Sequence, residues 1–574
     1  MNFKKQLAKE ICSIIQLDEF NHDEILNMIE IPSHNMGDFA FPCFKLAKAL
    51  KKAPNLIAQD LEAKIIKKIN SIEFIDSIQV VNAYVNVYIN KECYVEAVLK
   101  DVLDKEHSFG DSSIGAGKSI CIDYSSPNIA KPFHIGHLRS TVIGNSLYKI
   151  HEKLGYKVVG INYLGDWGTQ FGKLIVAYKN WSSKELVEEF EIEELTKIYV
   201  KFHEEAENNP ESGLEDEARE WLVKMQNGDE EALELWKWFC SISMKEFERV
   251  YNMLGITFDS YKGESFYNDK MMPVVEDIKA KGLLVESEGA KIVDLDEFNM
   301  PPCLILRRDG GTLYPTRDIS AAIYRKETYN FEKSLYVTAL DQNLHFAQWF
   351  KVIDLMGYEW AKDLVHVPFG LVSLPEGKIA TRKGRVVLME DILNSAIDKT
   401  KNIIEEKNPN LVNKDQVAKD VGIGAIVFND LFNSRVKNVV FDLDRMLNFQ
   451  GETGPYVQYT HARACSILEK ENFSKDLLDD ICYSLISDNY SFELIKLLGQ
   501  YPEKIVDASN KYEPFIITRH LIDICQAFNK FYDENNIKNS EQDLKVARLG
   551  IVFATKNIIF NALSLLGVNA PEKM

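Results

Sequence analysis

The fold class of this chain follows from one segment, residues 119–163: SICIDYSSPNIAKPFHIGHLRSTVIGNSLYKIHEKLGYKVVGINY. Its first part alternates apolar side chains as a strand does, at Ile120, Ile122 and Tyr124. After a loop that contains two prolines, apolar residues recur at helical spacing up to Gly155, which stands where a helix C-terminal cap belongs. A second strand pattern follows at once. This order of strand, helix and strand predicts a parallel α/β sheet.

Patterns outside this segment extend the prediction to the whole chain. Further strand patterns occur in KSLYVTALDQ and LVHVPFGLVSL, and the chain of 574 residues is too long for one core of about 250 to 300 residues. We therefore expect an α/β protein of several parts. They are an α+β N-terminal domain at 1–112, a Rossmann-like catalytic domain at 113–385 with helical insertions at about 180–300, a helical linker at 386–450 and an all-α domain at 451–574.

The charge is uneven along the chain. The formal net charge of −19 argues at first sight against a nucleic-acid partner, because phosphate binding needs clustered Lys and Arg. Residues 182–236 hold 18 acidic and five basic residues, so this segment accounts for most of the excess. We interpret it as an exposed helical insertion, which leaves basic surfaces elsewhere open. Lys45, Lys48, Lys51 and Lys52 can share one helix face, either a plain solvated face or one that touches an RNA backbone.

Cysteine usage and hydropathy limit the class of protein. The nine cysteines are scattered without a Cys-x-x-Cys pair, so neither a structural zinc site nor a disulfide framework is indicated. The N-terminus is amphipathic rather than a secretory leader, and no run of about 18 apolar residues occurs. We expect no membrane span and a cytoplasmic location.

The loop between the first strand and its helix has the chemistry of a ligand site. In an open parallel sheet, ligands bind at this kind of loop. His134 and His137 lie at the expected start of the helix, where unpaired N–H groups and the helix dipole favour phosphate. Gly136 between them lets a flat ring approach the backbone closely. A lone histidine at such a place is more often a cap or a core residue, but the spacing His-x-Gly-His is far more restrictive.

A second phosphate-binding pattern is excluded. Gly115-Ala116-Gly117-Lys118-Ser119 looks like the end of a P-loop, but position 112 is Ser where the earlier glycine is required. The run also precedes a strand instead of linking a strand to a helix. An unrelated P-loop ATPase is therefore not indicated.

Two motifs together resemble class I aminoacyl-tRNA synthetases. His134-Ile135-Gly136-His137 is similar to their first signature, and Lys378-Ile379-Ala380-Thr381-Arg382, followed by Lys383-Gly384, is similar to their mobile Lys-Met-Ser-Lys-Ser loop. Ile379-Ala380 replaces Met-Ser, and Arg382 stands at the last Lys, which keeps the charge. Several further segments resemble the arginyl-tRNA synthetase family, in the expected order from residue 125 to 468: SSPNIAKPFHIGHLRSTVIGNSL, NYLGDWGTQFG, LYPTRDISAA, DQNLHF, TRKGRVV and GPYVQYTHARACSIL. GDFAFPCFKLAKALKK is similar to the additional N-terminal, tRNA-contacting domain of that family.

The resemblance implies three groups of site residues. Implied for catalysis are His134, Gly136, His137, Lys378, Arg382 and Lys383, with Lys131 as the phosphate contact that compensates for a non-standard mobile loop. Implied for arginine binding are Asn128, Glu264, Tyr314, Asp318 and Gln342, since carboxylates that accept paired N–H bonds select a planar guanidinium over an ammonium. Without the resemblance, Asp318 would read as a plain N-terminal helix charge. Implied for tRNA are Tyr456, Tyr459 and Arg463 in a helical anticodon-binding domain, although aromatics at such spacing often belong to a core.

The implied substrates are L-arginine, ATP and tRNA(Arg). The arginine carboxylate, with a pKa of about 3.5, is already ionised, so activation needs positioning and charge stabilisation rather than a general base. Mg²⁺ should accompany ATP, held mainly by phosphate and water, because no protein cage for a metal is evident. The sequence leaves the oligomeric state open, and we take a monomer as the working expectation.

Two alternatives remain beside an arginine-tRNA ligase. A class I synthetase for another amino acid would lack a pocket with Asp318, Tyr314 and Gln342. A synthetase-like RNA-binding protein without catalysis would have no need of His134, Gly136, His137 and Lys378.

Overall fold

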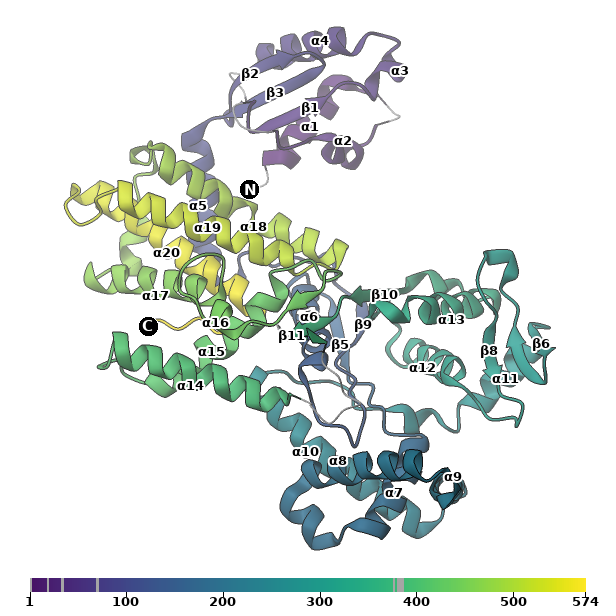
Figure 1. Cartoon of the computed structure of the whole chain (residues 1–574). Coiled ribbons are helices and arrows are strands. Elements are labelled where there is room, and N and C mark those ends of the chain that lie inside the picture. Colours follow the sequence, from purple (N-terminus) through teal and green to yellow (C-terminus); the bar gives the residue numbers. More distant parts are fainter. Residues whose placement is uncertain (1–2, 18–19, 33–35, 69–71, 375–376, 379–386) are drawn as a thin grey trace. The chain divides into compact units, whose positions relative to one another are not determined.

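The computed structural model of the chain contains two compact units, each built from separate stretches of sequence (Figure 1). The first unit comprises residues 1–109, 464–501 and 523–558, and the second comprises 110–463, 502–522 and 559–574. The structure describes residues 3–17, 20–32, 36–68, 72–374, 377–378 and 387–574.

A four-stranded parallel sheet is the centre of the second unit. Its order is β10-β9-β4-β5, formed by the strands Leu364–Phe369, Lys333–Ala339, Ser119–Asp123 and Lys157–Ile161. Asp123 at the end of β4 is in register with Ile161 of β5 and Tyr336 of β9. The central strand β4 therefore ends between two neighbours that run the same way, which creates the edge where a parallel sheet binds ligands.

Helices cover both faces of this sheet. Val159 and Ile161 of β5 lie in a core with residues of α12 (Tyr314–Tyr329) and α13 (Asn343–Leu355). Gly160 between them faces α6, because a Cβ there would lie 3.3 Å from the ring of Tyr148. Since strand side chains alternate between faces, α6 and the pair α12 and α13 lie on opposite faces.

Local signals determine the bounds of α6 (Ile135–Lys153). His134 is the N-cap and His137 completes a capping box, so two backbone N–H groups of the first turn are satisfied by imidazole nitrogens. Leu138, Val142 and Ile150 are buried, as the helical spacing predicts. The helix ends just before Gly155, whose φ of 86° is readily available only to glycine.

The insertion between β5 and β9 contains helices and a small sheet. Helices α7 (Thr169–Trp181), α8 (Lys184–Asn208), α9 (Leu214–Gln226) and α10 (Glu230–Leu254) pack against one another (Figure 1). They are followed by α11 (Met271–Ala280) and by an antiparallel sheet of β6 (Leu284–Ser287), β7 (Ala290–Val293) and β8 (Cys303–Leu306). The hairpin of β6 and β7, which the helical expectation for 180–300 did not include, turns at Glu288 and Gly289, both at positive φ as a two-residue turn requires.

A second small sheet and three helices follow the parallel sheet. The sheet contains β11 (Val372–Leu374), β12 (Gly377–Lys378) and β13 (Val439–Val440), and the helices are α14 (Met389–Lys407), α15 (Lys414–Leu431) and α16 (Leu443–Met446). Arg139 of α6 joins these parts: it donates to the carbonyl oxygens of Gly370 and Lys437 at 3.0 and 2.6 Å and pairs with Asp430 of α15 at 3.1 Å. All four residues belong to the second unit.

The first unit has its own core. An antiparallel sheet of β1 (Phe39–Pro42), β3 (Tyr84–Ile89) and β2 (Ile75–Val81) packs with α1 (Phe3–Ile15), α2 (His22–Met28) and α4 (Pro54–Lys68) around buried Leu7, Ile25, Phe41, Leu61 and Val85. The remaining N-terminal helices are α3 (Leu46–Leu50) and α5 (Lys91–Lys105). The long C-terminal helices are α17 (Gly454–Lys470), α18 (Asn489–Lys511), α19 (Phe515–Glu534) and α20 (Gln542–Leu565), and each contributes residues to both units.

The predicted fold class is confirmed. The chain has a parallel α/β sheet, an α+β N-terminal part and a helical C-terminal part. The four-part division by residue number stays a prediction. Among the described residues, one helix, α20, is long enough and apolar enough to cross a membrane. Its most apolar stretch is 83% buried inside the protein, as in the core helix of a folded domain.

Candidate active site

The loop after β4 has an unusual backbone. Ser125, Ser126 and Ala130 have φ values of 69°, 47° and 63°, a region that residues with a side chain adopt at a cost of about 1 kcal/mol or more each. The Ser125 N–H donates to Ser140 Oγ at 2.9 Å, and Ser126 Oγ donates to Asp123 Oδ1 at 2.9 Å. The strained loop is thus tied to the end of β4 and to α6.

Two histidine rings stack at the end of this loop. The rings of His134 and His137 are 4.0 Å apart and inclined by 28°. Nδ1 of His134 accepts the N–H of Gly136 at 3.0 Å, and Nδ1 of His137 accepts the N–H of His134 at 3.2 Å. Since Nδ1 is an acceptor in both rings, the proton of each neutral ring is on Nε2. Both rings therefore offer an Nε2–H donor to a ligand.

The charge state of this pair follows from its surroundings. Burial lowers the pKa of His134, and the Lys131 ammonium lowers it further. Burial also lowers the pKa of His137 well below its usual value, with smaller effects from His134 and Lys131. Both rings are neutral at neutral pH. Gly136 is required beside them because a Cβ would lie 2.7 Å from Cε1 of His134.

Lys131 and Asn128 are both exposed on the same loop. The backbone near Asn128 pairs with the segment after β5: the Ile129 N–H donates to the Gly165 carbonyl, and the Gly165 N–H donates to the Pro127 carbonyl, each at 3.1 Å. The Glu264 N–H donates to the neighbouring Leu164 carbonyl at 2.9 Å. The backbone around residue 165 therefore holds two of the predicted arginine-binding residues near one another.

The segment of the second signature is described only in part. Lys378 ends β12, and the predicted residues Arg382 and Lys383, like Ile379 and Ala380, lie outside the described residues. After this segment the chain returns to the first signature, where the Met389 N–H donates to the Phe133 carbonyl at 2.9 Å. The start of α14, which follows this segment in the chain, is therefore held directly beside His134.

The predicted arginine-binding carboxylates have protein partners. Glu264 pairs with Arg317 at 2.8 Å, and Asp318 pairs with Nε2 of His345 at 2.6 Å. Burial raises the pKa of Glu264 to about 7, an effect that Arg317 opposes and that Asp318 and Asp166 increase. A carboxylate has about four lone-pair sites, so these contacts leave acceptor capacity for a ligand.

The other two predicted arginine contacts are open to solvent. Tyr314 is the first residue of α12, four residues before Asp318, and it is 66% exposed. Gln342 ends the short 3-10 helix Leu340–Gln342, just before α13, and is exposed. These two side chains and the paired carboxylates thus come from α12 and its neighbours.

Sequence reasoning did not find several charged residues of this region. Asp123 at the end of β4 pairs with Arg325 of α12 at 2.8 Å, and both side chains are buried. The Arg325 guanidinium also lies 5.1 Å from the ring centre of Tyr163. Arg317 and His345 were missed as partners of Glu264 and Asp318. The motif NYLGDWG contains Tyr163 and DQNLHF contains His345, so both lay in quoted motifs, but nothing in their spacing indicates a partner.

The predicted tRNA-binding residues lie on α17. Tyr459 is 49% exposed, whereas Tyr456 and Arg463 are partly buried. The protein thus covers part of Tyr456 and Arg463, and Tyr459 has the largest solvent-exposed surface of the three.

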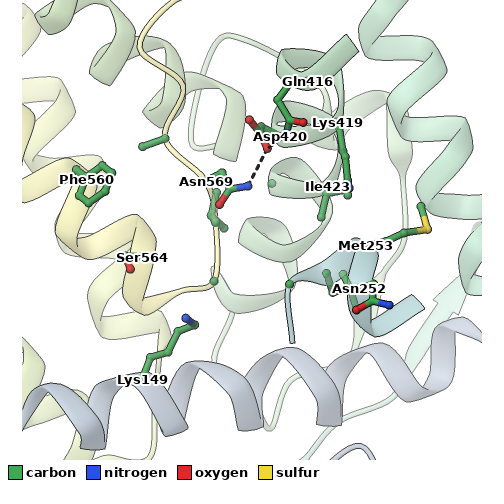
Figure 2. Close-up of a pocket in the computed structure, with 16 residues that line it drawn as sticks. Lys149, Asn252, Met253, Gln416, Lys419, Asp420, Ile423, Phe560, Ser564 and Asn569 are labelled. Carbon is green, nitrogen blue, oxygen red and sulfur yellow. Dashed lines mark hydrogen bonds between the residues drawn. The ribbon is translucent and has the colours of Figure 1, made fainter. Parts of the chain in front are cut away.

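A cavity of about 230 Å³ lies elsewhere in the second unit. Figure 2 shows side chains of its lining, where Asp420 of α15 accepts hydrogen bonds from Asn569 at 2.7 Å and from Gln416 at 2.9 Å. It contains none of the predicted site residues.

Three protein-family models match the chain. "tRNA synthetases class I (R), catalytic domain" matches residues 98–443, "DALR anticodon binding domain" matches 457–574, and "Arginyl tRNA synthetase N terminal domain" matches 1–89.

Whole-length relatives agree with these matches. The chain is 56% identical to the arginine–tRNA ligase of Alkaliphilus metalliredigens and 55% identical to that of Clostridioides difficile, with 99% of both chains covered in each case. Among solved structures, the arginyl-tRNA synthetase of Thermus thermophilus has the same fold, with a TM-score of 0.82 at 22% identity and full coverage of both chains. That of Plasmodium falciparum has a TM-score of 0.80 at 25% identity and covers 100% of this chain and 99% of its own. With more than half of its residues identical over nearly the whole length of such relatives, the chain belongs to the arginyl-tRNA synthetase family of class I tRNA synthetases.

Proposed function

We propose that the chain is an arginine-tRNA ligase, which activates L-arginine with ATP to arginyl-adenylate and transfers the arginyl group to the 3′-terminal ribose of tRNA(Arg). One observation carries this proposal. The stacked pair His134 and His137 occupies the start of α6 in a chain that matches arginine–tRNA ligases from end to end.

In the activation step, the arginine carboxylate attacks the α-phosphorus of ATP and pyrophosphate leaves. The nucleophile is already ionised, so the protein must position the two substrates and stabilise the charge on the phosphoryl oxygens. The Nε2–H groups of His134 and His137, the N-terminus of α6 and the ammonium of Lys131 are the donors that serve this purpose. We assign Lys378, Arg382 and Lys383 to the same phosphates.

Mg²⁺ fits this scheme as a companion of ATP. Within the described part of the chain, no group of three or more His, Cys, Asp or Glu side chains is arranged to hold a metal. Phosphate oxygens and water would then supply most of its ligands, which suits an ion that keeps part of its hydration shell. Its role is to neutralise charge on the phosphates.

Arginine is recognised, in this proposal, by charge and by planar hydrogen bonding. Asp318 and Glu264 provide carboxylate oxygens, Tyr314 lies at the exposed start of the helix that carries Asp318, and Gln342 lies exposed just before α13, the helix that carries His345, the partner of Asp318. A site built for a guanidinium leaves buried acceptors unpaired when another amino acid enters, and this discriminates strongly. In the second step, a terminal ribose hydroxyl of tRNA, the 2′-hydroxyl by class, attacks the adenylate carbonyl and AMP leaves.

The function is tested by ATP–pyrophosphate exchange with each amino acid in turn, with and without total tRNA. We expect exchange with arginine alone among the amino acids, and only when tRNA is present. Exchange with a different amino acid would overturn the pocket assignment. Absence of exchange under every condition would favour a non-catalytic RNA-binding protein.

We further propose that Tyr459 of α17 stacks on an unpaired tRNA base, with Tyr456 and Arg463 as neighbouring contacts. The exposed ring of Tyr459 supports this role. Tyr459→Ala should weaken binding of tRNA(Arg) about tenfold, since stacking on an aromatic contributes about 1 to 3 kcal/mol per base. Tyr459→Phe keeps the ring and should bind within about twofold of the wild type. Filter binding or fluorescence titration measures both, and equal affinity of Tyr459→Ala and wild type would remove Tyr459 from the interface.

We also propose that the enzyme acts in the cytoplasm as a monomer. The sets of catalytic and arginine-binding residues named above come from one chain, so none of these roles requires a second copy.

A further inference from the structure

One face of helix α10 holds the loop that carries Lys131. Ser243, Glu246, Phe247 and Tyr251 are spaced as residues on one side of a helix are. Tyr251 Oη and Ser125 Oγ are hydrogen-bonded at 2.8 Å, at the start of the loop. Ser243 Oγ accepts the N–H of Ala130 at 3.0 Å, in its middle. Since Ser125 and Ala130 are two of the strained residues, these contacts hold the loop in a backbone conformation that it would otherwise leave.

On the C-terminal side of Lys131, the first residue of the chain that donates a hydrogen bond to α10 is Phe133, and its acceptor is Glu246. The Oε1 atom of Glu246 accepts the N–H of Phe133 at 3.0 Å. Pro132 has no N–H, so Phe133 provides the first backbone donor after Lys131. The ring of Phe133 packs edge-on against Phe247 and Tyr251 of the same helix face, with ring centres 5.9 and 5.5 Å apart. Phe133 is therefore held by α10 through both its backbone and its side chain.

The Glu246 carboxyl costs free energy at this buried position. The residue is only 3% exposed, and within the described residues its Oε2 has no hydrogen-bond partner. Burial raises the pKa of Glu246 to about 7, opposed by the Phe133 N–H and Arg249 and increased by Glu390 and Glu191. An apolar residue would avoid this cost, so the acceptor that Glu246 provides to the loop is the property that distinguishes it.

The same helix also contacts the start of α14, which follows the second-signature segment in the chain. Phe133, which donates to Glu246, accepts the N–H of Met389 with its carbonyl oxygen. Arg249, three residues after Glu246, pairs with Glu390 at 3.4 Å and with Glu191 of α8 at 3.0 Å. Glu246 thus lies at a junction of α10, the first signature and the start of α14.

We infer that Glu246 is a positioning residue for ATP activation: by fixing the amide of Phe133, it holds Lys131 in the place where its ammonium meets the phosphates. This inference rests on the proposed function and extends it to a helix of the insertion. Lys131 has an exposed side chain on a strained loop, so its position depends on the backbone on either side of it.

Glu246→Ala should lower kcat/KM for ATP in arginine-dependent exchange by about tenfold or more, because a misplacement of about 1 Å can cost about 100-fold. KM for arginine should change less than about threefold, because the N-terminal side of the loop, with Asn128, keeps its contacts to Tyr251 and Ser243. Glu246→Gln retains the acceptor oxygen and should restore kcat/KM to within about threefold of wild type. The control is Glu248→Ala, which removes an exposed carboxylate from the same helix and should leave both constants unchanged.

A double-mutant cycle with Lys131→Ala separates positioning from a general loss of structure. If Glu246 acts through Lys131, the double variant Lys131→Ala with Glu246→Ala should be no slower than Lys131→Ala alone. The inference would be overturned if the losses of the two single variants multiplied in the double variant. It would also be overturned by wild-type activity of Glu246→Ala, or by equal impairment of the Ala and Gln variants. If Glu246→Ala fails to fold, Glu246→Asp takes its place in the same cycle, since the shorter side chain withdraws the acceptor and keeps the carboxylate. Wild-type exchange with arginine is measured first: its absence would refute the function itself, and with it this inference.

Discussion

Replacing His137 by alanine is expected to slow arginine-dependent ATP–pyrophosphate exchange by about 100- to 1,000-fold, the loss seen when one preorganised hydrogen-bond donor to a transition-state oxygen is removed. The geometry gives the reason. Nδ1 of His137 is occupied by the His134 N–H, which leaves the neutral ring with its proton on Nε2, available to a phosphoryl oxygen. Burial keeps the ring neutral by lowering its pKa, so throughout the neutral range Nδ1 stays an acceptor for the His134 N–H and the proton stays on Nε2. Single-turnover formation of the adenylate measures the effect.

A matched variant distinguishes this role from helix capping. His137 also completes the capping box of α6, so His137→Ala removes a cap as well as a donor. Glutamine at this position is a good capping residue, and His137→Gln should retain thermal stability while it remains slow in exchange. Full activity of His137→Gln would show that the imidazole ring itself is not needed for activation. Unchanged exchange by His137→Ala would remove it from the catalytic set.

Replacing Asp318 by alanine is expected to lower kcat/KM for arginine by at least about 30-fold, because loss of the carboxylate that we assign to the guanidinium of bound arginine costs about 2 kcal/mol or more. Asp318 lies near Glu264 and Asp123, since its charge raises the pKa of both of these carboxyls. Asp123 and Glu264 are each paired with an arginine, whereas Asp318 is paired with His345, so Asp318 is the carboxylate of this group that we assign to a cationic side chain. KM for ATP should change little, because the donors that we assign to the phosphates are His134, His137 and Lys131 and not Asp318.

The control for this prediction is Glu327→Ala. Glu327 is an exposed carboxylate on the same helix, α12, and its removal should leave KM for arginine unchanged. Equal KM for arginine in Asp318→Ala and wild type would exclude Asp318 from the pocket. Fluorescence-monitored unfolding of Asp318→Ala would reveal whether the loss of its contact with His345 also destabilises the second unit.

The contacts of the histidine pair are local in the sequence, whereas those of the arginine-binding carboxylates are not, so the sequence could predict the two sites to different extents. The cap of α6 depends on residues three positions apart, and such contacts follow from helix geometry alone. The pair of Glu264 and Arg317 joins a 3-10 helix to α12, and in the sequence these two elements are separated by the strands β6 to β8. No period or spacing encodes that contact, so Arg317 and His345 were found only in the folded chain.

Sequence alone determined the order of strands and helices around residues 119–163, the start of the helix near His134, the glycine at 155 and the family, because periodicity, helix-end signals and motifs are local properties of the chain. The tertiary structure decided which side chains meet: Asp123 with Arg325, Asp318 with His345, and the face of α10 with the loop of Lys131. It also revealed the hairpin at Glu288, where a tight turn interrupts a stretch expected to be helical. The physical reason is that these contacts join residues far apart in sequence, and their free energy comes from burial and hydrogen bonding that exist only once the elements have packed.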